Sequence, residues 1–203
     1  MKCLEVVRKW CHDMTTAPCT IDWNFIATNE GNSKQGYVPC DENGVPIGHS
    51  GVTIGMGIDL GQMTPANLQN IDIPVALRQR LIPYTEKKGM VAKEFLHNWP
   101  LVLNGADVSL LNSQCSQAHA KIIENEYNAN SDFTFGFLDS DKQTVIMDVG
   151  WQYGSIKNRC PHFFGMITKG QWQDAVHELR NFGDKYPTRR NLEADLLEKS
   201  LQQ

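Results

Sequence analysis

Apolar residues recur at helical spacing along most of the chain after residue 64. In successive stretches they return every three or four positions, which is the period of an amphipathic helix. Two helix starts can be recognised from their side chains. One is Thr64-Pro65, and the other is either Asp139 or Ser140. The sequence therefore predicts a helical lobe over 64–203, with helices within 73–84, 89–99, 109–130, 139–155, 170–183 and 188–201.

The segment 32–62 has a different pattern, with many glycines and polar residues. Asn43-Gly44 is a strong tight-turn signal. The stretches 36–41 and 51–61 on either side can pair as a short, irregular β-hairpin or as a three-stranded sheet. This segment is predicted to form a small β lobe.

Residues 1–30 are predicted to form N-terminal helices. The stretch 3–14 has a roughly helical apolar stripe. Thr20 or Asp22 can cap a second helix, which Gly31 would end. Together these patterns predict an α+β fold with two lobes, formed as a single domain over 1–203.

Composition narrows the class of protein. The chain has 203 residues, of which 41% are hydrophobic, and a net charge of −4, which argues against nucleic acid as a ligand. No apolar run is long enough to span a membrane, and the N-terminus lacks the apolar region of a signal peptide. Of Arg189 and Arg190, we expect one to be buried against an acidic partner and the other to lie in solvent.

The six cysteines leave two interpretations open. They are either idle thiols in a reducing compartment or partners in disulfides in an oxidising one. Neither the cysteines nor the histidines have the spacing of a metal site, so we expect no metal and no cofactor. His49-Ser50 lies near the glycine-rich segment but lacks a predicted third member for nucleophilic chemistry.

Three carboxylates lie within or just before the glycine-rich segment 32–62. Glu30 ends the N-terminal helices, Asp41 lies in the hairpin, and Asp59 follows Thr53 by six residues. Glycoside hydrolysis needs one carboxylic acid to protonate the leaving oxygen and a second group to position water or attack the sugar. The same residues can also be a solvated helix end, a turn residue and a cap, and spacing alone does not decide between these.

Several motifs in order give the chain a resemblance to a known family. FIATNEG (25–31) is followed by a hairpin and GVTIGMG (51–57), and later come QTVIMDVGWQYGS (143–155), GQWQDAVHELRNFG (170–183) and RRNLEADLL (189–197). This series resembles the phage-type lysozymes over roughly residues 20–200. The long hairpin and the Thr53–Asp59 spacing are more similar to pesticin-like toxins, which include lysozyme-like domains of type VI secretion spike proteins.

The resemblance implies roles for individual residues. Glu30 would be the general acid, Thr53 would position the attacking water, and Asp59 would be the second carboxylate. Short phage lysozymes carry that aspartate inside the hairpin, which leaves Asp41 as the alternative. Further glycan contacts are expected at Asp41, Gly57, Gln152 and Tyr153.

The implied function is a muramidase that cleaves peptidoglycan, with inversion expected because a threonine holds the water. As an antibacterial toxin it would be delivered without a signal peptide, act in the periplasm or cell envelope, and have a cognate immunity protein as a partner. The alternatives are a non-catalytic peptidoglycan-binding module, a chitosanase-like hydrolase and a phage lysis enzyme.

Overall fold

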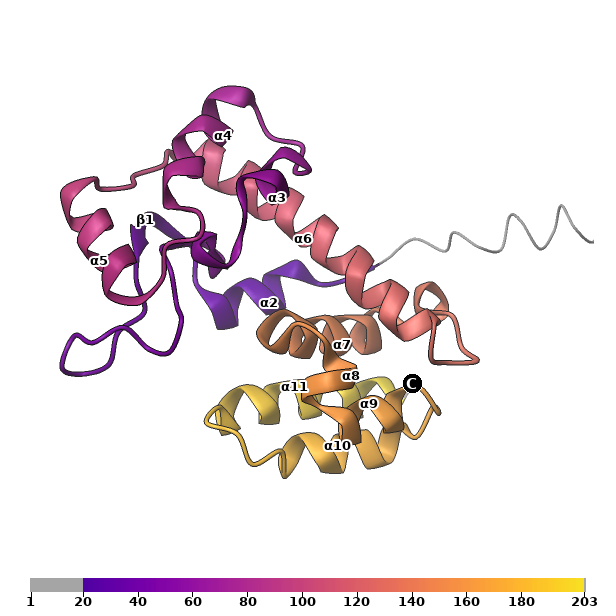
Figure 1. Ribbon diagram of the computed structural model, residues 1–203. Coiled ribbons are helices and arrows are strands. Elements are labelled where there is room, and N and C mark those ends of the chain that lie inside the picture. Colours follow the sequence, from indigo (N-terminus) through magenta and orange to yellow (C-terminus); the bar gives the residue numbers. More distant parts are fainter. Residues whose placement is uncertain (1–19, 203) are drawn as a thin grey trace, which may run out of the picture. The chain divides into compact units, whose positions relative to one another are not determined.

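The computed structural model describes residues 20–202, so the predicted helix within 3–14 lies outside the described residues. The chain divides into two compact units (Figure 1). One, here called the β unit, is residues 27–119; the other, the helical unit, comprises the described residues 20–26 and 120–202. The division falls within α2 (Trp23–Glu30) and α6 (Gly105–Asn128), so each of these helices supplies residues to both units.

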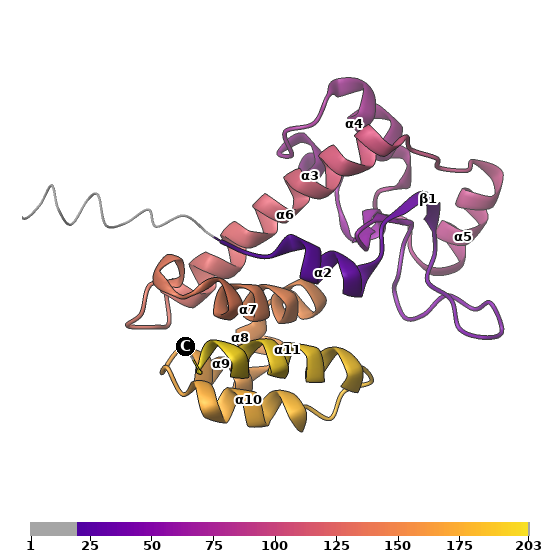
Figure 2. The same cartoon turned by 180° about the vertical axis from the view of Figure 1, so that it is seen from behind.

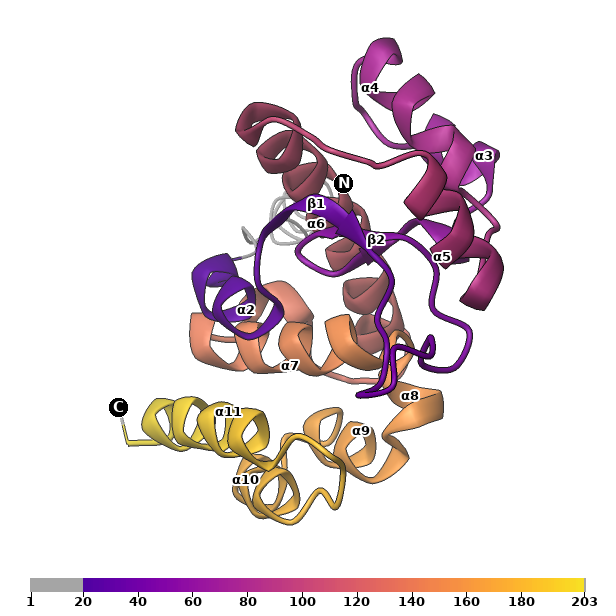
Figure 3. The same cartoon turned by 90° about the vertical axis from the view of Figure 1, so that its left-hand side faces the viewer.

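The β unit contains a three-stranded antiparallel sheet in the order β1-β2-β3. Its strands are β1 (Ser33–Tyr37), β2 (Thr53–Gly55) and β3 (Ile58–Asp59). Figure 3 shows β1 beside β2, and the segment 101–103 follows the other edge of β1 through backbone hydrogen bonds of 2.8 and 2.9 Å. Of the two predicted arrangements, the three-stranded sheet is the one that forms.

Short helices complete the β unit. They are η1 (Leu60–Gln62), α3 (Pro65–Gln69), α4 (Val75–Leu81), η2 (Ile82–Tyr84), α5 (Gly89–Asn98) and the first part of α6. Thr64 caps α3 with a complete capping box, as its sequence predicts. In Figure 2, α4 lies beside the start of α6, where Arg80 Nη1 donates to Asp107 Oδ2 at 2.9 Å.

The β unit extends well beyond the predicted β lobe of 32–62. Strands of five, three and two residues cannot bury a core between themselves. Val52, just before β2, and Ile54 within β2 are therefore fully buried in one unit with helix residues such as Leu68, Leu81 and Leu111. The helices after residue 64 are thus part of the structure that supports the sheet.

The helical unit is organised around α7 (Ser140–Tyr153), whose residues 143–150 are all buried. Asp139 caps α7 by accepting from Lys142 N at 2.9 Å, so of the two predicted candidates Asp139 is the cap. The other elements are η3 (Phe135–Phe137), α8 (Ile156–Arg159), α9 (Pro161–Ile167), α10 (Trp172–Arg180) and α11 (Pro187–Ser200). Figure 1 shows α10 alongside α11.

The described chain is thus mostly helical with one small antiparallel sheet, which confirms the predicted α+β class. Among the described residues, none of the helices combines the length and the apolar character that crossing a membrane takes.

Candidate active site

Glu30 is the last residue of α2. Asp22 caps the start of this helix, since its carboxylate accepts from the first backbone amides at 2.9 and 3.2 Å; of the two predicted caps, Asp22 is therefore the one used. Gly31 follows with a φ of 76°, and its amide bonds to Ala27 O at 3.0 Å, which ends the helix where predicted. Glu30 is left partly exposed at the negative end of the helix dipole, where a charged carboxylate is unfavourable.

Glu30 lies against the turn that joins β2 to β3. Gly55 and Gly57 in this turn have φ of 63° and 78°, a conformation that favours glycine. A Cβ atom placed on Gly57 would lie 3.0 Å from Glu30 Oε2. Because glycine has no side chain, position 57 leaves room for the Glu30 carboxyl beside the turn.

Thr53 and Asp59 are paired directly across β2 and β3. Thr53 is only 4% exposed, and its hydroxyl donates to Gly51 O at 3.3 Å. Because the donor is used by the backbone, the lone pairs of Thr53 Oγ1 remain to accept a hydrogen bond from a water or a sugar hydroxyl.

The Asp59 carboxylate is held by several donors. Both of its oxygens lie 3.1 Å from Gly51 N, Oδ1 accepts from Gly61 N at 2.9 Å, and Oδ2 accepts from Gln62 Nε2 at 3.3 Å. Gly51 and Gly61 also pack backbone to backbone, since a Cβ on Gly51 would come within 2.4 Å of Gly61 Cα. The Asp59 carboxylate is therefore held in place by these donors, and the backbone around it is tightly packed.

Tyr37 joins this group, although the sequence did not single it out. It pairs with Thr53 across β1 and β2, and its side chain is partly exposed. Its pKa is raised above the usual value of a phenol, first by burial and then by the negative charges of Glu30 and Asp59. Tyr37, Thr53 and Asp59 are in register across the three strands, and the Glu30 carboxyl lies against the turn that joins β2 to β3.

Asp41, the alternative second carboxylate, is engaged in its own turn. Its Oδ1 accepts from Asn43 N at 2.9 Å and from Val45 N at 2.8 Å, and the residue is exposed. The turn at Asn43-Gly44 thus forms as predicted. Asp59 likewise caps the turn that follows it, η1, and differs from Asp41 in being paired with Thr53 across the sheet.

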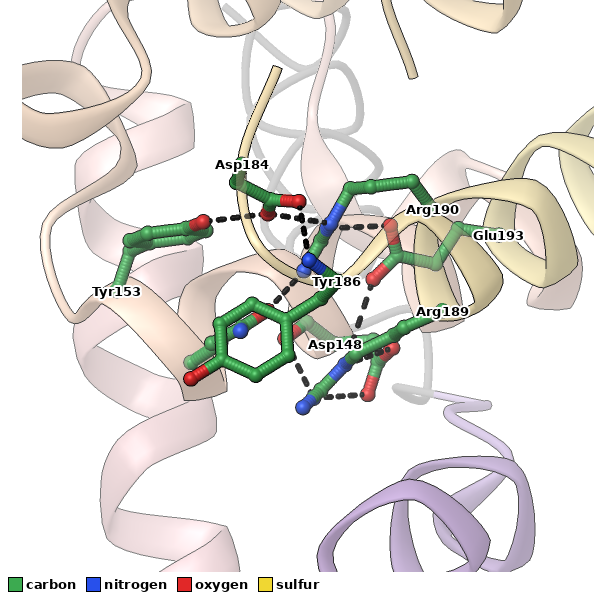
Figure 4. Close-up of polar contacts among 8 residues, drawn as sticks. Asp148, Tyr153, Asp184, Tyr186, Arg189, Arg190 and Glu193 are labelled. Atoms are coloured by element: carbon green, nitrogen blue, oxygen red, sulfur yellow. Dashed lines mark hydrogen bonds and ion pairs between the residues drawn. The ribbon is translucent and has the colours of Figure 1, made fainter. Parts of the chain in front are cut away.

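Gln152 and Tyr153 belong to the helical unit, where their polar atoms contact charged residues, and Figure 4 shows Tyr153 beside Asp184. Tyr153 Oη donates to Asp184 Oδ2 at 2.6 Å, and Gln152 Oε1 accepts from Arg190 Nη2. Burial first, and then the hydrogen bond to Asp184, raise the pKa of Tyr153 above its usual value. The expected glycan contacts of these two residues stay predictions.

The charged cluster corrects the expectation that one of Arg189 and Arg190 lies in solvent. Both are largely buried, with side chains 11% and 2% exposed. Arg189 bonds to both oxygens of Asp148, at 2.7 and 3.0 Å, while Arg190 binds Glu193 and lies 3.1 Å from Asp184. Acidic partners on α7, on α11 and in the loop before α11 accommodate the two guanidinium groups, and the contribution of Asp148 on α7 is not visible in the local sequence around α11.

The cysteines that the structure describes are free thiols, namely Cys40, Cys115 and Cys160. Cys3, Cys11 and Cys19 lie outside the described residues, so the question of disulfides stays open for them. Within residues 20–202, no group of three or more potential ligands among His, Cys, Asp and Glu is placed to hold a metal ion.

A comparison with protein families matches residues 20–173 to the pesticin family, described as a bacterial toxin homologue of phage lysozyme, C-terminal part. A search of curated proteins found no match. The family match covers more than half of the chain and includes Glu30, Tyr37, Thr53 and Asp59. The resemblance inferred from the motifs is thereby confirmed, and the chain belongs to the pesticin family of lysozyme-like bacterial toxin domains.

Proposed function

We propose that the chain is a muramidase, which hydrolyses the β-1,4 bond between N-acetylmuramic acid and N-acetylglucosamine in peptidoglycan. Membership of a toxin family homologous to phage lysozyme supports this chemistry. The observation that carries the proposal is that the Glu30 carboxyl lies against the β2–β3 turn, in the sheet where Thr53 and Asp59 are paired across β2 and β3. Glycoside hydrolysis requires such a pair of carboxyl groups around one sugar ring.

In the proposed reaction Glu30 gives its proton to the glycosidic oxygen as the bond from that oxygen to the muramic acid C1 breaks. A water molecule attacks C1 from the opposite face, and its proton passes to Asp59. Thr53 Oγ1 accepts a hydrogen bond from this water, because its own proton is directed to Gly51 O. The product then has the inverted configuration at C1, which fits a carboxyl separation of roughly 6.5–9.5 Å.

The first test uses isolated peptidoglycan, digested with the wild type and with Glu30→Gln. Products are reduced with borohydride and identified by mass spectrometry. Fragments that end in reduced muramic acid, absent with Glu30→Gln, support a muramidase with Glu30 as the acid. Release of chains ending in reduced glucosamine would contradict it, and no release at all would favour the non-catalytic binding module.

Asp59→Asn and Asp41→Asn form a matched pair for the second carboxylate. Asparagine at 59 keeps an Oδ1 acceptor for Gly61 N but cannot take the proton of water, so we expect activity to fall by more than about 100-fold. Asp41→Asn keeps the turn acceptor and should remain active. The reverse ranking would assign the role to Asp41.

The stereochemical course is tested separately. NMR identifies which anomer of the product forms first during digestion, and this anomer shows whether the configuration at C1 is inverted or retained.

We further propose that the protein acts on the cell envelope of a target bacterium after delivery by a secretion apparatus, such as a type VI spike, and that the producing cell makes an immunity protein against it. Family membership among bacterial toxins supports this setting. Expression fused to a periplasmic signal peptide should lyse a bacterial host, while Glu30→Gln should not. Harmless expression of the active enzyme in the periplasm would refute the toxin role.

A further inference from the structure

Asn112 is a buried polar residue of α6, with 8% of its surface exposed. Its side chain contacts two segments of the β unit that are distant from Asn112 in the sequence. Oδ1 accepts from Met56 N at 3.1 Å, and Nδ2 donates to Asn32 Oδ1 at 3.0 Å. One amide group therefore connects α6 to the β2–β3 turn and to the chain that follows α2.

The fit of this amide depends on the glycine at position 55. A Cβ on Gly55 would lie 2.2 Å from Asn112 Oδ1, a distance that no side chain can adopt without displacing the amide. Within this turn, the backbone N–H of Met56 donates to the Asn112 carbonyl. A buried backbone N–H needs such an acceptor.

Both segments that Asn112 holds border Glu30. Asn32 lies two residues after Glu30, and Met56 precedes Gly57, whose backbone lies against Glu30 Oε2. We propose that Asn112 is a positioning residue for Glu30, because it fixes the turn and the helix exit between which the Glu30 carboxyl is placed. This role rests on the muramidase function proposed above, and Asn112 itself would contact no reacting atom.

The test compares Asn112→Leu, which has a similar size without hydrogen-bonding groups, with Ser116→Ala. Ser116 is one turn further along α6 and is also buried, at 5% exposure. For Asn112→Leu we expect kcat on peptidoglycan fragments to fall about 10- to 100-fold, as for a displaced catalytic group, while KM changes less than about 3-fold. Ser116→Ala should keep both constants within about 2-fold, and thermal unfolding is measured for each variant.

Asn32→Ala provides a second variant in case Asn112→Leu does not fold. Asn32 is exposed, so its truncation removes one contact of Asn112 without opening the core. Its kcat should fall in the same direction by roughly 3- to 10-fold, less than for a fully displaced group. Wild-type kcat in whichever of these variants folds, or an equal fall in Ser116→Ala, would overturn the positioning role.

A failure of the proposed function is recognised separately, because the wild type would then release no muramic acid ends. In that case the ¹³C shift of the Glu30 carboxyl at one fixed pH replaces kcat as the readout. A change of this shift in Asn112→Leu or Asn32→Ala, but not in Ser116→Ala, supports the positioning role. An unchanged shift in both overturns it.

Discussion

Glu193 should make the protein less stable as the pH rises through the weakly acidic range. Its side chain is fully buried, and its pKa is raised well above the usual value, first by burial and then by the hydrogen bond that the protonated Glu193 carboxyl donates to Asp148. The cluster in Figure 4 has carboxyl groups at Asp148, Asp184 and Glu193 against two guanidinium groups, so one proton balances its charge. That proton is best placed on Glu193.

Glu193→Gln isolates this effect, because glutamine imitates the protonated acid: it keeps an acceptor for Arg190 and gains a donor for Asp148. A raised native pKa means that the folded state binds the proton more tightly than the unfolded state, where glutamate titrates near about 4.3. The stabilisation of the wild type by protonated Glu193 is therefore complete below about pH 4.3. It is lost as the pH rises toward the native pKa. The loss approaches about 1.4 kcal/mol per pH unit within that window.

The assay is urea unfolding of both proteins at half-unit steps from pH 4 to 8, plotted as the difference in free energy of unfolding. The free energy of unfolding of Glu193→Gln should increase relative to that of the wild type as the pH rises, until the native pKa is reached. Glu198→Gln is the matched control on α11, because its side chain is 42% exposed and its surface ion pair with Arg180 contributes little to stability. A Glu193→Gln difference that is flat, or that shrinks as the pH rises, would refute the buried proton.

Three further changes test the packing. Gly51→Ala should lower the free energy of unfolding by about 1–3 kcal/mol, because its Cβ would lie 2.4 Å from Gly61 Cα; an unchanged urea midpoint would contradict the backbone contact. Gly165→Ala, inside α9 with open space around it, should instead raise stability by about 0.5–1 kcal/mol, and a loss would show hidden crowding. Burial raises the pKa of Cys115 to about 12, so iodoacetamide at pH 8 should leave it unmodified in peptide maps while the more exposed Cys40 reacts first.

The parts of the fold that sequence predicts are those set by neighbouring residues. Asp22, Thr64 and Asp139 each cap the helix that they precede, and Gly31 ends α2, because caps act on amides within one turn. By contrast, α8 and α9 were not predicted. They have four and seven residues, which is too short for a periodic apolar pattern to stand out.

The candidate site shows the same limit. Glu30, Thr53 and Asp59 could be selected because they lie in ordered motifs, and the β2–β3 turn does bring Glu30 beside Gly57 and Thr53 opposite Asp59. Tyr37 and Asn112 carry no local signal. The first depends on strand register, and the second on a helix 80 residues after the Asn32 that it contacts. Contacts of this kind are decided by tertiary packing.

The four glycines between 51 and 61 have a consequence for telling active from inactive relatives. Each is required by backbone geometry: two by the turn and two by the contact of Gly51 with Gly61. These backbone reasons hold whether or not the protein is an enzyme. A relative that has become a pure binding protein would keep all four glycines, so the glycine pattern diagnoses the fold. On the proposed mechanism, the chemistry is diagnosed by the side chains at positions 30, 53 and 59 instead.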